Sequence, residues 1–179
     1  RYAVEETRLG IPLMFAFDVI HGYRTIFPIP LAESASWDLE AMERSARIAA
    51  IEASAAGQNW TFAPMVDISH DPRWGRVMEG AGEDPYLGSQ IAKARVRGFQ
   101  GNDLSLPDTI AATAKHFAAY GEVIAGRDYN NVDISRRKLW ETHLPPFKAA
   151  LDEGVRSFMN AFNEFEGVPS SANTYLVTD

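Results

Sequence analysis

A buried strand, a charged loop and a helix start follow one another in the stretch Asn59-Trp-Thr-Phe-Ala-Pro-Met-Val-Asp-Ile-Ser-His-Asp-Pro-Arg-Trp-Gly-Arg-Val-Met-Glu-Gly-Ala-Gly-Glu-Asp-Pro85. Residues 59–66 are apolar and aromatic, which predicts a buried strand ending at Asp67. Asp84-Pro85 supplies a helix N-cap followed by proline at the first helical position. Connections between elements are usually only a few residues long, so this long, charged loop is the first place to look for function.

The same order of strand, polar loop and helix occurs on both sides of this stretch. Further strands are expected at residues 13–17, 109–117 and 155–162. Helices are expected from an Asp38 cap to a stop at Gly57, from Pro85 to Gly98 and Gly101, from Ser135 to Gly154 with a break at Pro145-Pro146, and from Asn173.

This alternation predicts an α/β fold with a parallel sheet and helical crossovers. Two closures are compatible with it: an open doubly wound sheet or a (β/α)8 barrel. The glycine fingerprint of a dinucleotide-binding open sheet is absent after the first strand. Each strand ends in polar or charged residues, as in barrels whose site lies at the C-terminal face. We therefore expect a partial TIM-like barrel of about four βα units. Residues 1–179 would be part of a single barrel domain truncated at both ends, because a complete barrel takes roughly 250 residues.

Composition excludes several classes of protein. The 179 residues are 46% hydrophobic and 23% charged, enough apolar material for an ordinary globular core. The net charge of −7 argues against nucleic acid and anionic membranes as partners. The absence of cysteine excludes disulfides and thiolate chemistry. No apolar run approaches the roughly 20 residues of a membrane span.

Charged side chains follow the predicted strands and would surround one pocket. A rim that carries both carboxylates and cationic donors suits a polyhydroxylated ligand, because hydroxyl groups both donate and accept hydrogen bonds. The candidates from sequence chemistry alone are Asp18, His21, Arg76, Lys115, His116 and Arg127.

Each candidate also has a structural interpretation. An aspartate at a strand end, such as Asp18, is commonly a turn or cap residue. Arg76 has possible ion-pair partners in Glu79 and Glu83. Lys115 is harder to explain structurally, because a lysine at the end of an apolar strand needs a partner or a ligand.

A metal site is the less favoured interpretation of the same region. Its ligands would come from Asp67, His70 and Asp71, together with histidines after the neighbouring strands. No His-x-His pair ends the first strand, and Lys115 beside His116 would oppose a cation. We expect neither a metal nor another cofactor.

Seven short motifs occur in one order along nearly the whole chain. They are Asp18-Val-Ile-His-Gly22, Phe27-Pro-Ile-Pro30, Ser36-Trp-Asp38, Asp71-Pro-Arg-Trp-Gly-Arg76, Gly82-Glu-Asp-Pro85, Lys115-His-Phe-Ala118 and Met159-Asn-Ala-Phe-Asn163. This ordered set resembles the β-glucosidase branch of the family 3 glycoside hydrolases. The resemblance implies an N-terminal TIM-like barrel and a retaining, exo-acting hydrolase that releases terminal glucose from β-glucosides or oligosaccharides. It also favours a periplasmic or secreted protein and leaves a homo-oligomer possible.

The resemblance assigns roles to individual residues. Asp18 would accept hydrogen bonds from the outer hydroxyls of the terminal sugar, and Met159 would line the apolar face of the pocket. The side chains that would donate to the same ring are those of Arg76, Lys115, His116 and Arg127. Arg73 would support the loop, and Phe162 stands where many family members carry tyrosine.

The catalytic carboxylates are expected outside this chain. Retaining glycosidases use two carboxyl groups roughly 5–5.5 Å apart. The resemblance places the nucleophilic aspartate on a strand beyond Asp179, which is itself a helix residue, and the acid/base glutamate in a following domain. No catalytic residue is therefore assigned within residues 1–179.

Two other functions are compatible with parts of this sequence. The N-acetylglucosaminidase branch of the same family would show Lys-His-Phe-Pro-Gly-His-Gly, whereas this chain has Lys115-His-Phe-Ala-Ala-Tyr-Gly121. A non-catalytic sugar-binding barrel is the second alternative, and the presence of the nucleophile-bearing strand in the full-length protein would exclude it.

Overall fold

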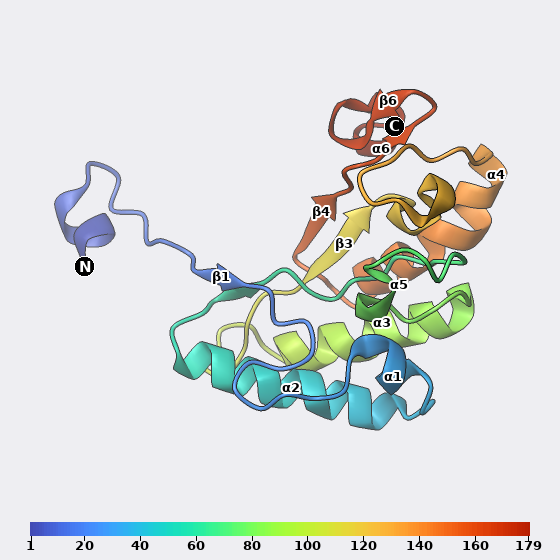
Figure 1. The fold of residues 1–179 in the computed structure, drawn as a ribbon. Coiled ribbons are helices and arrows are strands. Elements are labelled where there is room, and N and C mark those ends of the chain that lie inside the picture. Colours follow the sequence, from blue (N-terminus) through green and yellow to red (C-terminus); the bar gives the residue numbers. More distant parts are fainter.

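The computed structural model describes all residues from Arg1 to Asp179. Four short parallel strands lie side by side in it, in the order in which they occur in the chain (Figure 1). β1 pairs with β2 at Ala16↔Trp60, and β3 pairs with β4 from Thr113↔Ser157 onward. Parallel bridges at Trp60↔Ala111 and Met65↔Lys115 join the two pairs. The strands are β1 (Ala16–Phe17), β2 (Trp60–Thr61), β3 (Thr113–Phe117) and β4 (Ser157–Asn160).

The long helices between these strands pack in the same order. α2 contacts α3, and α3 contacts α5, so the three form one row beside the strands (Figure 1). The predicted α/β alternation is confirmed. The helices are α1 (Pro30–Ser34), α2 (Leu39–Ala55), α3 (Pro85–Gln100), α4 (Arg136–Lys138), α5 (Leu144–Asp152) and α6 (Thr174–Val177). None of them has both the length and the apolar character needed to cross a membrane.

The predicted N-caps of the long helices are present. The Asp38 carboxylate accepts from the Ala41 N–H at 2.9 Å, and the Asp84 carboxylate accepts from the Leu87 N–H at 2.6 Å. Ser135 likewise accepts from the Lys138 N–H at 3.1 Å. Each cap satisfies a backbone donor that the first helical turn leaves without a partner.

Gly98 has a different role from the predicted helix stop. It lies inside α3, and a Cβ atom there would be 2.5 Å from the Glu43 carbonyl oxygen and 2.6 Å from the Ala46 Cβ. Glycine is therefore required for the close approach of α2 and α3. The helix ends at Gly101, whose φ of 58° is one that glycine adopts readily.

The strands are shorter than predicted. Leu13, Met14 and Phe15 precede β1 and are each more than half exposed, and of the three only Phe15 is bonded to the next strand segment, through its carbonyl and the Asn59 N–H at 2.9 Å. In residues 59–66 only Trp60–Thr61 form a regular strand. The Ala63 and Pro64 carbonyls still accept from Thr113 and Lys115, but Pro64 has no N–H to donate, and a bridge forms again at Met65.

The break predicted at Pro145-Pro146 falls where two helical elements follow one another without a loop between them. A π-helical segment, Leu139–His143, leads directly into α5, where both prolines occupy the first turn. Prolines are tolerated at this position because the N–H groups of a first turn need no helical acceptor. The structure adds a β-hairpin that was not predicted, formed by β5 (Glu164–Phe165) and β6 (Val168–Pro169).

A buried ion pair connects α1, in the segment after β1, to α3. The side chains of Arg95 and Glu33 are 5% and 9% exposed, and Arg95 also donates to the Ile20 carbonyl at 3.3 Å. Removing either partner would leave a buried charge uncompensated. The pair thus holds the chain that follows Asp18 against the helix layer.

Candidate functional site

A buried lysine and an exposed carboxylate meet where two strands end. Lys115 belongs to β3, and its side chain is only 3% exposed. Its Nζ donates to Oδ1 of Asp18, which follows β1, over 2.7 Å. The Asp18 side chain is 58% exposed, so it can contact Lys115 and a solvent-borne ligand together.

Arg76 and Glu79 form the second half of this charged group. Nε and Nη2 of Arg76 donate to the two carboxylate oxygens of Glu79 at 2.8 and 2.9 Å. Glu79 also lies 3.9 Å from Lys115 Nζ. Burial alone would lower the pKa of Arg76, but the Glu79 carboxylate outweighs it and the pKa is raised. Four side chains from three strand ends thus form one network of alternating charge.

Glu79 was named from the sequence only as a possible ion-pair partner of Arg76. The structure shows that this ion pair exists and that Arg76 nevertheless belongs to the group around Lys115. The i,i+3 spacing of the two residues was the available signal, because such spacing brings side chains together within a single turn.

His116 is hydrogen-bonded to another carboxylate, the buried one of Asp67. Its backbone N–H and its ring Nδ1 both donate to Oδ2 of Asp67, at 3.0 and 2.8 Å. Both side chains are nearly inaccessible, at 2% and 0% exposure. The ring of Tyr120 packs edge-on against His116, with centroids 5.2 Å apart. The sequence indicated Asp67 only as a possible metal ligand, and its actual partner is 49 residues away.

Tyr120 connects His116 to Arg76 and to the loop that begins at Asp67. The guanidinium carbon of Arg76 lies 5.8 Å from the Tyr120 ring centroid, within the range of a cation–π contact. Trp74, fully buried, packs edge-on against the same ring and donates from Nε1 to Asp128 at 3.0 Å. Burial raises the pKa of Tyr120, which keeps the phenol neutral. These contacts fix the loop that carries Arg76.

The remaining candidates are less closely connected to this network. Met159 is the register partner of Lys115 on the adjacent strand β4, and is half-buried. Side by side in a parallel pair, the two residues occupy the same face of the sheet. Arg127 is exposed in the loop after β3 and forms no ion pair. The structure does not bring Arg127 into the group formed by Asp18, Arg76 and Lys115.

The side chains considered as metal ligands have other partners. Asp71 binds Arg73 through Nε and Nη2 at 2.9 and 2.7 Å, which lowers the pKa of Asp71 to about 2. His70 contacts Glu122, which lies in the 3-10 helical turn Tyr120–Glu122 after β3. The described residues contain no cluster of three or more potential metal ligands.

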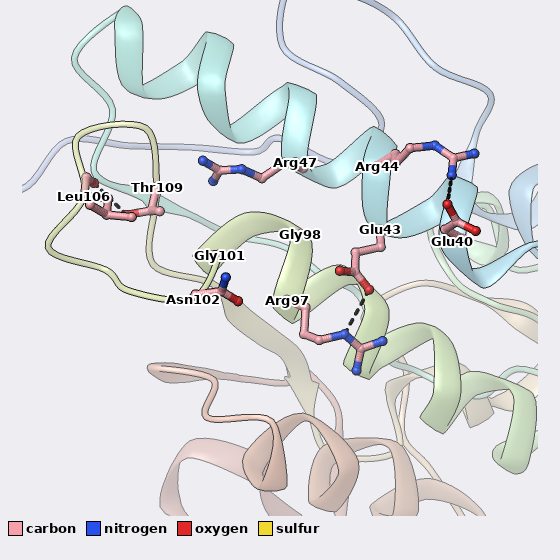
Figure 2. Close-up of a pocket in the computed structure, with 10 residues that line it drawn as sticks. All are labelled: Glu40, Glu43, Arg44, Arg47, Arg97, Gly98, Gly101, Asn102, Leu106 and Thr109. Carbon is pink, nitrogen blue, oxygen red and sulfur yellow. Dashed lines mark hydrogen bonds and ion pairs between the residues drawn. The ribbon is translucent and has the colours of Figure 1, made fainter.

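A surface hollow of about 460 Å³ lies away from this group. Figure 2 shows it between α2, α3 and the loop that follows α3. Its cations are already paired, Arg97 with Glu43 at 2.9 Å and Arg44 with Glu40 at 2.5 Å. We assign it no function, because it lies on the helix side and none of the strand-end residues line it.

Charged side chains gathered at the carboxyl ends of successive parallel strands define an α/β protein with its site at that edge. The chain belongs to the family described as glycosyl hydrolase family 3, N-terminal domain, whose model matches residues 1–179. The β-glucosidase resemblance noted in the sequence is thereby confirmed at the level of the family.

Named relatives agree with this assignment. A periplasmic β-glucosidase from Salmonella typhimurium is 46% identical over 173 residues, which cover 97% of this chain and 23% of that protein. A β-xylosidase from Formosa agariphila is 39% identical over 185 residues, covering 96% of this chain and 26% of that protein. The crystal structure of a Listeria innocua β-glucosidase in complex with glucose matches with a TM-score of 0.93 and 48% identity, over 97% of this chain and 24% of that one. The chain thus spans about a quarter of the length of these relatives.

Proposed function

We propose that residues 1–179 provide the sugar-binding part of a retaining, exo-acting β-glucosidase. The observation that carries this proposal is the network of Asp18, Lys115, Arg76 and Glu79 at the strand ends. It presents a carboxylate acceptor beside ammonium and guanidinium donors, which is the combination that a ring of vicinal hydroxyls requires.

The roles within the site follow from these contacts. Asp18, the exposed partner, accepts from the sugar hydroxyls, while Lys115 and Arg76 donate to the same ring. His116 offers Nε2, because Nδ1 is occupied by Asp67. Met159, beside Lys115 on the sheet, contributes the apolar surface. Arg127 is the outermost of the proposed donors, because it is exposed and lies outside the group formed by Asp18, Arg76 and Lys115.

The bond-breaking carboxylates, we infer, come from elsewhere in the full-length protein. Asp18 and Glu79 are each paired with a cation, which favours binding over nucleophilic or acid/base roles. A retaining mechanism places its two carboxyl groups roughly 5–5.5 Å apart. No pair within residues 1–179 is assigned to it.

The same reasoning extends to the domain and its location. The chain-ordered parallel strands and the single row of helices support a (β/α)8 barrel domain that includes residues 1–179. The periplasmic and lysosomal β-glucosidases among the relatives support a location outside the cytosol.

A β-xylosidase is the second candidate, because several relatives carry that name. Xylosides lack the hydroxymethyl group of glucosides, so the two activities separate in one assay. The full-length protein should be given 4-nitrophenyl β-glucoside and β-xyloside, and kcat/KM compared. A higher value for the xyloside would replace glucose by xylose in the proposal, and hydrolysis of neither would refute both.

The stereochemistry is tested separately. In the full-length protein, proton NMR during early turnover should show the β-anomer of the sugar as the first product, since retention requires a double displacement. The α-anomer as first product would refute the retaining mechanism. It would leave the substrate assignment unchanged.

A further inference from the structure

Asp67 makes an unusual pair of contacts behind the proposed sugar site. One oxygen, Oδ2, accepts from both the backbone N–H and the ring Nδ1 of His116. The Asp67 side chain is completely buried. Its other oxygen, Oδ1, has no partner within the protein. The only side chain that donates to Asp67 is therefore that of His116.

This arrangement determines which ring nitrogen carries a proton. An ionised carboxylate can only accept hydrogen bonds, so Nδ1 of His116 must be the donor. Nε2 forms no hydrogen bond within the chain and is left for another partner. The Tyr120 ring, at 5.2 Å and 82° to the imidazole, blocks one alternative orientation of the ring.

We propose that Asp67 is a positioning residue that acts on the substrate through His116. By holding the backbone and the ring from one oxygen, it fixes the tautomer and the direction in which Nε2 meets a substrate hydroxyl. Rotation of the imidazole would break the Nδ1 contact and leave the buried carboxylate with the backbone N–H of His116 as its only donor. The proposal rests on the proposed sugar-binding function of His116 and adds the residue that controls it.

A double-mutant cycle in the full-length protein tests this directly. The variants are Asp67→Ala, His116→Ala and the double substitution, assayed by kcat/KM for an aryl β-glucoside. We expect Asp67→Ala to lower kcat/KM roughly tenfold, the effect of one misplaced hydrogen bond. In the His116→Ala background the same change should cost less than about twofold, because its target is absent. A tenfold loss in both backgrounds would mean that Asp67 only supports the fold, and would overturn the proposal.

Two further variants sharpen the cycle. Asp67→Asn keeps an oxygen that can accept both bonds, so it should recover most of the activity lost in Asp67→Ala. An Asn variant as impaired as the Ala variant would count against the positioning role. Ser69→Ala is the matched control, because Ser69 is buried nearby and its hydroxyl has no protein partner. It should change kcat/KM less than twofold, and a larger effect would show that any buried substitution here disturbs the site.

A measurement on the unchanged protein covers the case in which Asp67→Ala does not fold. A crystal structure of the full-length protein with glucose should place His116 Nε2 within about 3.2 Å of a sugar hydroxyl while Nδ1 stays on Asp67. A sugar out of reach of Nε2 would overturn the inference. If the protein hydrolyses no glycoside, the proposed function fails. The double-mutant cycle can then still be measured, by comparing the affinities of the same variants for glucose.

Discussion

Replacing Asp18 with alanine should lower kcat/KM of the full-length protein for an aryl β-glucoside by roughly 10²–10⁴. Asp18 presents a carboxylate to the ligand, and a charge-assisted hydrogen bond contributes about 1.5–3 kcal/mol. Two such bonds to sugar hydroxyls account for the expected range, since each 1.36 kcal/mol is a tenfold change in rate.

The structure adds a second effect to this loss. Lys115 is buried, and Asp18 Oδ1 at 2.7 Å is its nearest carboxylate. Without Asp18, the carboxylate left near Lys115 is that of Glu79, which is 3.9 Å away and already accepts from Nε and Nη2 of Arg76. The ammonium group is then drawn toward Glu79 and away from the substrate, so the variant should lie in the upper half of the range.

Steady-state kinetics with 4-nitrophenyl β-glucoside provide the assay, and thermal unfolding shows whether the variant folds. Asp103→Ala serves as the control, because Asp103 is an exposed aspartate in the loop after α3, remote from the strand ends. It should change kcat/KM less than twofold. If Asp18→Ala keeps more than half of the wild-type kcat/KM, Asp18 does not bind the sugar, and the proposed sugar site is wrong.

Three further predictions concern stability and assembly. Residues 1–179 expressed alone should show no aryl-glucosidase activity. They should elute from size-exclusion chromatography as a dimer or aggregate, because β1 and β4 have open edges. An active monomer that unfolds cooperatively would contradict this prediction. Gly98→Ala should lower the free energy of unfolding by about 1–3 kcal/mol by forcing α2 from α3, whereas Gly75→Ala, with open space around it, should be neutral. Burial lowers the pKa of His143 to about 4, despite the opposing charges of Glu122 and Asp67. The unfolded chain therefore binds more protons between pH 6.5 and 4, and stability is lost as pH falls through this window. His143→Gln should remove about 3 kcal/mol from the change in the free energy of unfolding across this pH window. An unchanged pH dependence would show that His143 does not titrate this way.

Several features of this protein were determined within short stretches of sequence. Asp38 and Asp84 cap their helices because a cap needs only a backbone donor three residues away. The order of strands and helices follows from local hydrophobic patterns for the same reason. The candidate residues at strand ends were also predictable, because parallel strands bring their carboxyl ends to one edge.

Strand lengths depended on partners that a local pattern does not contain. The apolar residues before β1 predicted a longer strand, but an apolar residue becomes part of a ladder only where another strand lies beside it. Gly98 resembled a helix stop because its sequence context is the same as that of a cap. Only the approach of α2, more than forty residues earlier in the chain, gives it a packing role.

The pairing of charges was decided by tertiary structure alone. Lys115 meets Asp18 across 97 residues of sequence, and His116 meets Asp67 across 49. A sequence supplies several carboxylates of equal chemistry for each cation, and side-chain contacts at 2.7–3.0 Å depend on how the strands are placed. The kinds of residue at the site were therefore set by the sequence, whereas the folded chain selected Glu79 and Asp67 as partners and left Arg127 apart.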